Sequence, residues 1–138
     1  MTQAITLRMV TRQAGGGEIV RTRRIDDGEA LIGRSAECDI HLPDLAVDMQ
    51  HALLWVAGQD RVSVESLTGQ PFAVDGQPTA RSELAAAGGH VLAFGDYDLT
   101  LGLGGEGDIA VTAKLFSQTG LIEEKQFLIP RFPNALNW

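Results

Sequence analysis

The sequence predicts an all-β fold, a sandwich of two antiparallel sheets, and three observations support this prediction. Short segments in which apolar and polar residues alternate recur along most of the chain, as they do in half-buried strands. Turn residues, mainly Gly, Asp and Pro, separate these segments at regular intervals. Helix signals are scarce, and many short strands with regular turns favour two packed sheets that each bury one face.

The first half of the chain contains five predicted strands, each a short apolar or alternating run. Ile5, Leu7 and Met9 alternate with polar neighbours in the first of them, and the last is the strongest apolar run of the chain. Gly15-Gly16-Gly17 and Asp26-Asp27-Gly28 supply turns. The five expected strands are residues 5–10, 18–25, 30–33, 40–42 and 51–57.

The second half continues the pattern with four more predicted strands. Asp75-Gly76 is a favoured tight-turn dipeptide, and Gly95-Asp96 joins the last two strands into a hairpin. Ser82 to Ala87 is compatible with one helical turn, which Gly88-Gly89 would end. The four expected strands are residues 61–67, 71–74, 91–94 and 97–101.

The C-terminal region differs in composition from the rest of the chain. Gly102 to Gly107 is glycine-rich, so we expect the sandwich to occupy residues 1–103 and a second region to occupy 104–138. That region would hold the glycine-rich boundary, a last strand at 109–116 and an apolar tail at 121–138 without a clear period. Such a tail packs on its own domain, packs on a partner or a second copy, or leads into a further segment, and these alternatives stay open.

Composition and charge exclude several classes of protein. The chain has 138 residues, of which 44% are hydrophobic and 21% charged, as expected of one globular domain. Its net charge of −7 disfavours binding to nucleic acid or to anionic lipid. No apolar run has the length of a membrane span, and the first residues do not resemble a signal peptide. The single cysteine, Cys38, cannot form an internal disulfide, so we predict a cytoplasmic protein or the cytoplasmic part of a membrane-associated protein.

The most informative residues surround the end of the predicted strand at 30–33. This buried strand ends in Gly33-Arg34, so the arginine emerges beside the loops at one end of the sandwich, where recognition sites usually lie. Its planar guanidinium suits a phosphate or a carboxylate. His51 begins the next apolar strand, where its ring can support the neighbouring loop through a hydrogen bond.

Several motifs occur in an order and spacing that together resemble the forkhead-associated (FHA) domain. This family is a β-sandwich that in many members binds phosphothreonine peptides through its loops. The resemblance covers residues from Ile5 to Leu103 and implies a sandwich of FHA type. The matching motifs are Gly33-Arg34, Asp39-Ile40-His41-Leu42, His51-Ala52, Val74-Asp75-Gly76 and the hairpin around Gly89 to Gly95.

The departures from the family pattern fall on the residues that contact phosphate. Asp48 stands where the family has a phosphate-contacting Ser, and Met49 stands where it has Arg or Lys. Gln70 stands where a loop Asn orients the bound peptide. The resemblance assigns a structural role to Gly33 and His51. It predicts peptide- or partner-binding loops that contain Arg34, Ser35, Asp48, Met49, Thr68 and Gln70.

Electrostatics indicates what the change at position 48 does to binding. A phosphothreonine carries about −1.5 to −2 charges, and a carboxylate ~4 Å away repels each unit by about 4 kcal/mol at an effective dielectric near 20. A micromolar complex is stabilised by only about 8 kcal/mol in total. Our hypothesis is that Asp48 pairs with Arg34 and fills the former phosphate pocket. The rival is that Asp48 points to solvent and Arg34 stays available.

Other chemistries have weaker support. Cys38, Asp39, His41 and His51 lack a recognised metal-ligand spacing, so we expect no metal and no cofactor. The chain has no Gly-x-Ser-x-Gly motif of a nucleophilic serine, and its glycine-rich stretch lacks the lysine and helix of a phosphate loop, so we expect no enzyme.

Two function classes remain, with a third that rests on family analogy. The first is a phosphate-independent protein-interaction module of FHA type. The second is a working phosphothreonine-peptide binder that relies on Arg34. The third is a scaffold domain of a bacterial membrane or secretion assembly, in which the aromatic C-terminal end would adjoin a membrane. In all three the partner is a protein or phosphoprotein.

Overall fold

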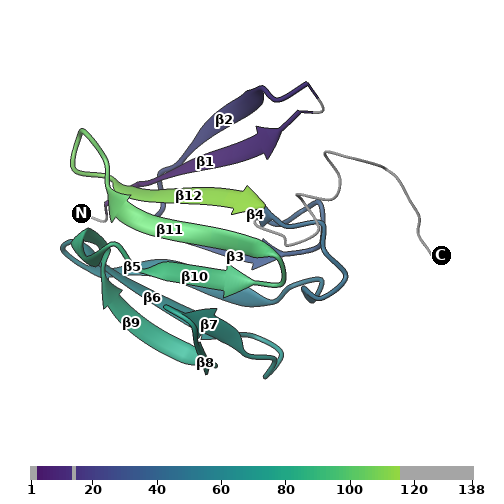
Figure 1. The fold of residues 1–138 in the computed structure, drawn as a ribbon. Helices are drawn as coiled ribbons and strands as arrows, with labels where there is room; N and C mark the ends of the chain where they lie inside the picture. The colour runs from purple at the N-terminus through teal and green to yellow at the C-terminus, as the bar shows by residue number, and fades with distance from the viewer. Residues whose placement is uncertain (1–2, 14, 116–138) are drawn as a thin grey trace.

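The computed structural model describes residues 3–13 and 15–115, which form two β-sheets packed face to face (Figure 1). In order across the larger sheet, the strands are β2 (Glu18–Ile25), β1 (Ile5–Arg12), β12 (Ile109–Leu115), β11 (Tyr97–Leu103), β10 (Val91–Phe94), β7 (Phe72–Val74) and β8 (Gln77–Thr79). The smaller sheet has the order β4 (Ile40–His41), β3 (Glu29–Gly33), β5 (Ala52–Gly58), β6 (Arg61–Ser66) and β9 (Arg81–Ala85). This architecture confirms the predicted all-β sandwich.

The core lies between the two sheets and follows the period of two in the sequence. Along β3, Ala30 and Ile32 are buried, and along β12 the residues Ile109, Val111 and Ala113 are buried while their neighbours are less so. Alternation therefore assigns one face of each strand to the core, which is the physical reason that the strand prediction succeeded.

Two pairs of strands run parallel, which the prediction of an antiparallel sandwich did not include. They are β1 with β12 and β3 with β4, whereas the other pairings in the described residues are antiparallel. β12 lies between β1 and β11, so the sandwich continues to Leu115, beyond residue 103 where the sequence predicted its end. The glycine-rich stretch is the turn between β11 and β12, in which Gly104 N–H donates to the Asp108 carbonyl at 2.7 Å.

The expected helical turn at residues 82–87 is wrong. Arg81–Ala85 forms β9, which pairs with β6 along its whole length, and only Ala86–Gly88 forms a short 3-10 turn. Leu84 is buried between exposed neighbours, which is the alternation of an edge strand. A single helical turn makes too few hydrogen bonds to offset the entropy of ordering it, so the long-range pairing with β6 prevails.

The predicted apolar tail at 121–138 lies outside the described residues. Within the residues that the structure describes, no helix has the length and apolar character needed to cross a membrane.

Candidate functional site

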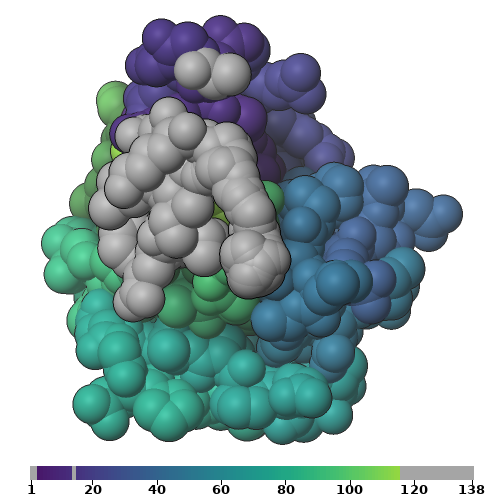
Figure 2. Space-filling model, turned by 45° about the vertical axis from the view of Figure 1, so that its right-hand side comes forward, coloured from purple at the N-terminus to yellow at the C-terminus, as the bar shows by residue number. Residues whose placement is uncertain are grey.

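The loops that follow β3, β4 and β6 meet at one end of the sandwich, and β3 delivers Arg34 to this site. Gly33 ends β3 against the loop between β4 and β5, because a Cβ atom at Gly33 would lie 2.3 Å from the Met49 carbonyl oxygen and 2.9 Å from Cys38 Sγ. Only glycine allows the two segments to approach this closely. The close approach places Arg34 beside the loop of residues 43–50. Figure 2 shows the blue segment that contains the loops after β3 and β4 projecting from one side of the molecule.

Backbone and side chain of Arg34 are both tied to that loop. The Arg34 amide donates to the Asp48 carbonyl at 2.9 Å, and the Ser35 amide donates to the Met49 carbonyl at 3.1 Å. Arg34 Nε donates to the Val47 carbonyl at 3.0 Å. The described residues make no other hydrogen bond or ion pair with the guanidinium.

Asp48 does not pair with Arg34, and this corrects the hypothesis drawn from the sequence. The Asp48 carboxylate instead accepts a 2.6 Å hydrogen bond from Thr68 Oγ1, and no ion pair joins it to Arg34 in the described part of the chain. The physical reason is that both groups already have well-placed partners in the loops. An exposed ion pair would add at most about 1 kcal/mol.

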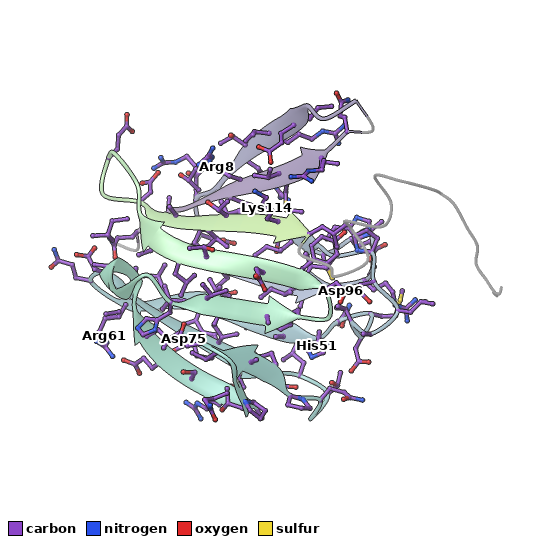
Figure 3. The ribbon with its side chains drawn as sticks, in the orientation of Figure 1. Arg8, His51, Arg61, Asp75, Asp96 and Lys114 are labelled. Carbon is purple, nitrogen blue, oxygen red and sulfur yellow. The ribbon has the colours of Figure 1, made fainter. Side chains whose placement is uncertain are left out.

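The buried side chain of His51 connects two of the loops. Its side chain is only 3% exposed, and its ring meets the ring of Phe94 edge to face with centroids 5.3 Å apart. The Asp48 amide donates to His51 Nδ1 at 3.0 Å, and His51 Nε2 lies 3.3 Å from the Pro71 carbonyl. The tautomer with its proton on Nε2 satisfies both bonds. His51 thereby connects the loop at 43–50 to the loop at 67–71; Figure 3 shows it at the same end of the sandwich as Asp96.

The remaining predicted site residues lie around this centre. Thr68 is exposed, and its Oγ1 also accepts from the Gln70 amide at 3.2 Å. Ser35 Oγ accepts from the Glu37 amide at 3.2 Å. Met49 is half exposed beside Asp48, and Gln70 is exposed on the loop after β6. The structure thus brings all six predicted loop residues to neighbouring loops, whereas their part in binding stays a prediction.

Two kinds of residue that the sequence reading missed also shape the site. Leu45 is 90% exposed, and Leu67 is half exposed next to Thr68, so apolar surface flanks the site. Asp44 fixes the loop from its other end, because its carboxylate accepts from the amides of Ala46 and Asp96, each at 2.8 Å. The sequence predicted the turn at Gly95-Asp96, but it did not predict that Asp44 contacts this turn.

The described side chains of the site are hydrogen-bonding groups and exposed apolar groups. Burial raises the pKa of the Cys38 thiol, which keeps it in the unreactive protonated form. The part of the chain that the structure describes holds no group of three or more His, Cys, Asp or Glu side chains placed to bind a metal ion.

Part of the chain is similar to a known family of domains. The family model for the FHA domain matches residues 30–95, the span from β3 to β10 that includes all three loops. This match confirms the resemblance found in the sequence. FHA domains are protein–protein interaction modules that bind phosphopeptides and generally are not enzymes. No curated protein sequence matches the chain.

Two solved structures with TM-scores above 0.5 share the fold. One FHA domain, solved for a structural and functional analysis of phosphothreonine-dependent FHA domain interactions, is 24% identical with a TM-score of 0.54, covering 75% of this chain and 98% of that chain. The FHA domain of the CT664 protein from Chlamydia trachomatis is 24% identical with a TM-score of 0.51, covering 68% and 90%. The FhaA FHA domain, complexed with the intracellular domain of Rv3910, is 26% identical with a TM-score of 0.48, covering 56% and 84%.

Proposed function

Because residues 30–95 of this chain form an FHA domain, we propose that it is a protein-interaction module that binds its partner without a phosphate group. The observation that carries the proposal is the carboxylate of Asp48. It stands at the position of the family's phosphate-contacting Ser, bonds to Thr68, and has no ion pair to offset its charge among the described residues.

The charge of this carboxylate opposes a phosphate ligand. At a separation of ~4 Å and an effective dielectric near 20, each unit of phosphate charge is repelled by about 4 kcal/mol. A micromolar complex has only about 8 kcal/mol of binding free energy. Since Arg34 does not neutralise Asp48, the repulsion acts on the ligand directly.

The neighbouring groups favour an unmodified partner. The Thr68 hydroxyl, a donor that could bind phosphate, is already used by Asp48 at 2.6 Å. Met49 brings a half-exposed apolar side chain to the position where relatives carry a cation. Leu45 and Leu67 add exposed apolar surface nearby. A partner segment with apolar side chains, and with one carboxylate or carbonyl for Arg34, fits this set of groups.

One observation favours the alternative, a working phosphothreonine-binding domain. The two terminal nitrogens of Arg34 have no partner within the described residues, and its Nε bond to the Val47 carbonyl orients the guanidinium. A guanidinium with two available nitrogens can bind a phosphate oxygen pair. This alternative therefore depends on whether one cation outweighs Asp48.

Direct titration separates the two functions. Fluorescently labelled phosphothreonine peptides and their unphosphorylated forms are added to wild-type protein and to the Asp48→Ser, Arg34→Ala and Arg81→Ala variants. Phosphate independence predicts no phosphate-dependent binding by wild type, and a gain in Asp48→Ser because the repulsion is removed. Arg81 lies exposed on β9 in the smaller sheet and belongs to none of the predicted binding loops, so Arg81→Ala is a matched loss of one positive charge.

The outcomes are distinct. Saturable micromolar binding of the phosphorylated peptide by wild type, lost in Arg34→Ala and kept in Arg81→Ala, would reject the proposal and establish the alternative. The scaffold function in a membrane or secretion assembly and the cytoplasmic location both remain predictions, since the C-terminal end on which the former depends lies outside the described residues.

A further inference from the structure

The open edge of the larger sheet is strongly basic, although the chain as a whole carries a net charge of −7. β2 forms this edge, with β1 as its one hydrogen-bonded neighbour in the described part of the chain, and every residue from Glu18 to Arg24 is exposed. In Figure 1, β1 and β2 lean away from the rest of the sandwich. These two strands carry five of the chain's 11 Lys and Arg residues, namely Arg8, Arg12, Arg21, Arg23 and Arg24.

The charges on one face of β2 are only partly neutralised by the protein. Arg21 and Arg23 lie on the same face, opposite Met9 and Leu7 of β1. Arg23 makes one long contact, 3.4 Å to Asp39, and its side chain remains 59% exposed. Arg21 has no partner among the described residues. Two arginines, whose Cα atoms are about 7 Å apart along the strand, therefore stand beside an unpaired backbone edge.

The other face of the same ribbon is different, because two of its cations form ion pairs. Arg24 contacts Asp108 at 2.7 Å and Asp26 at 2.8 Å, and Lys114 of the neighbouring β12 lies 3.4 Å from Glu18. Figure 3 shows Arg8 and Lys114 on this part of the sheet. Arg8 also lies on this face and has no partner among the described residues, so the face of Arg21 and Arg23 differs from it by carrying two neighbouring arginines on the edge strand itself.

We propose that β2 is a docking edge for an extended acidic segment of a partner protein. The segment adds as a further strand, bonds to the free N–H and C=O groups of β2, and places Asp or Glu at alternate positions against Arg21 and Arg23. A second copy of this chain fits the edge less well, because pairing β2 with another β2 brings arginines of the two strands close together. This proposal goes beyond the loop site and uses none of its residues.

A synthetic peptide tests the charge requirement. A fluorescein-labelled peptide of alternating Glu and Thr, about as long as β2, is titrated into the full chain and followed by anisotropy. We expect saturable binding, weakened about tenfold in the Arg21→Glu/Arg23→Glu variant. The matched control, Arg61→Glu/Arg81→Glu, makes the same change in net charge at exposed positions on β6 and β9 and should leave binding within about twofold.

Modified peptides test the backbone requirement. N-methylation at every second residue removes the N–H donors along one edge of the peptide, and both registers are made. We expect one register to abolish binding, because its missing donors are those that pair with β2. Three results would each overturn the proposal. They are equal binding by the parent and both N-methylated peptides, equal weakening by the control variant, and no binding of the parent peptide. The arginines would then serve only to protect the edge strand against aggregation.

Discussion

The close approach at Gly33 makes Gly33→Ala a severe test of how the site is assembled. The added Cβ would lie 2.3 Å from the Met49 carbonyl oxygen and 2.9 Å from Cys38 Sγ, well inside van der Waals contact. The carbonyl belongs to the backbone, so it cannot move aside as a flexible side chain would. That oxygen also accepts the hydrogen bonds from the Ser35 amide at 3.1 Å and from Cys38 Sγ at 3.3 Å.

The expected loss of stability follows from these contacts. Overpacking a well-packed site costs about 1–3 kcal/mol, and a hydrogen bond broken when the loop shifts costs about 1 kcal/mol more. We therefore expect Gly33→Ala to lower the free energy of unfolding by about 3 kcal/mol. A second change, Cys38→Ala, removes the sulfur contact but not the clash with the carbonyl, so the double variant should not recover.

Urea unfolding followed by circular dichroism measures this loss. Gly102→Ala is the control, because Gly102 lies in β11 without left-handed backbone geometry and a Cβ there meets no atom within 4 Å. Replacing such a strand glycine should stabilise the protein by about 0.5 kcal/mol. A Gly33→Ala protein within about 1 kcal/mol of wild type would refute the reasoning that this glycine is required by the loop contact.

Two further predictions concern the histidines. His51→Ala removes the acceptor of the Asp48 amide and the ring against Phe94, so thermal unfolding should report a loss of about 3 kcal/mol; a loss below about 1 kcal/mol would contradict its supporting role. The hydrogen bond from His90 lowers the pKa of Asp75, so this carboxylate stabilises the fold above its ordinary pKa and the contribution is lost as pH falls through the lowered value. Asp75→Asn should therefore lower the urea midpoint at pH 7, and its difference from wild type should shrink as the pH falls below the ordinary pKa of aspartate and Asp75 becomes protonated; a difference independent of pH would exclude this ionic contribution.

The sequence predicted most strands because burial of one strand face is recorded locally, in the alternation of side chains. The nine strands expected between residues 5 and 101 all occur, with ends shifted by a few residues at most. Pairing partners are not recorded in this way. Nothing in the local pattern of Ile109–Leu115 shows that this strand enters the sheet between β1 and β11, since that choice depends on packing across the whole domain.

In the candidate site, too, the sequence predicted the positions of residues along the chain but not their contacts. The position of Arg34 at the end of β3 and that of His51 before β5 follow from strand boundaries and were predicted. The partner of Asp48 was not, because Thr68 lies 20 residues away on a different loop. These two short side chains, on loops that lie side by side in the fold, form a hydrogen bond whose geometry depends on how both loops are anchored. The anchors, Gly33 against Met49 and His51 against Pro71, exist only in the folded chain.

The order of residues along the chain was thus sufficient to predict the sandwich, its resemblance to the FHA family and the residues in the loops at one end. Which of those residues touch, and which charges stay unmatched, required the packed domain. A hydrogen bond needs its two atoms within about 3 Å, and that distance between Arg34, Asp48 and Thr68 is set by the sheets that carry their loops. The same holds for Arg21 and Arg23, whose excess charge emerges only once β2 is found at the open edge.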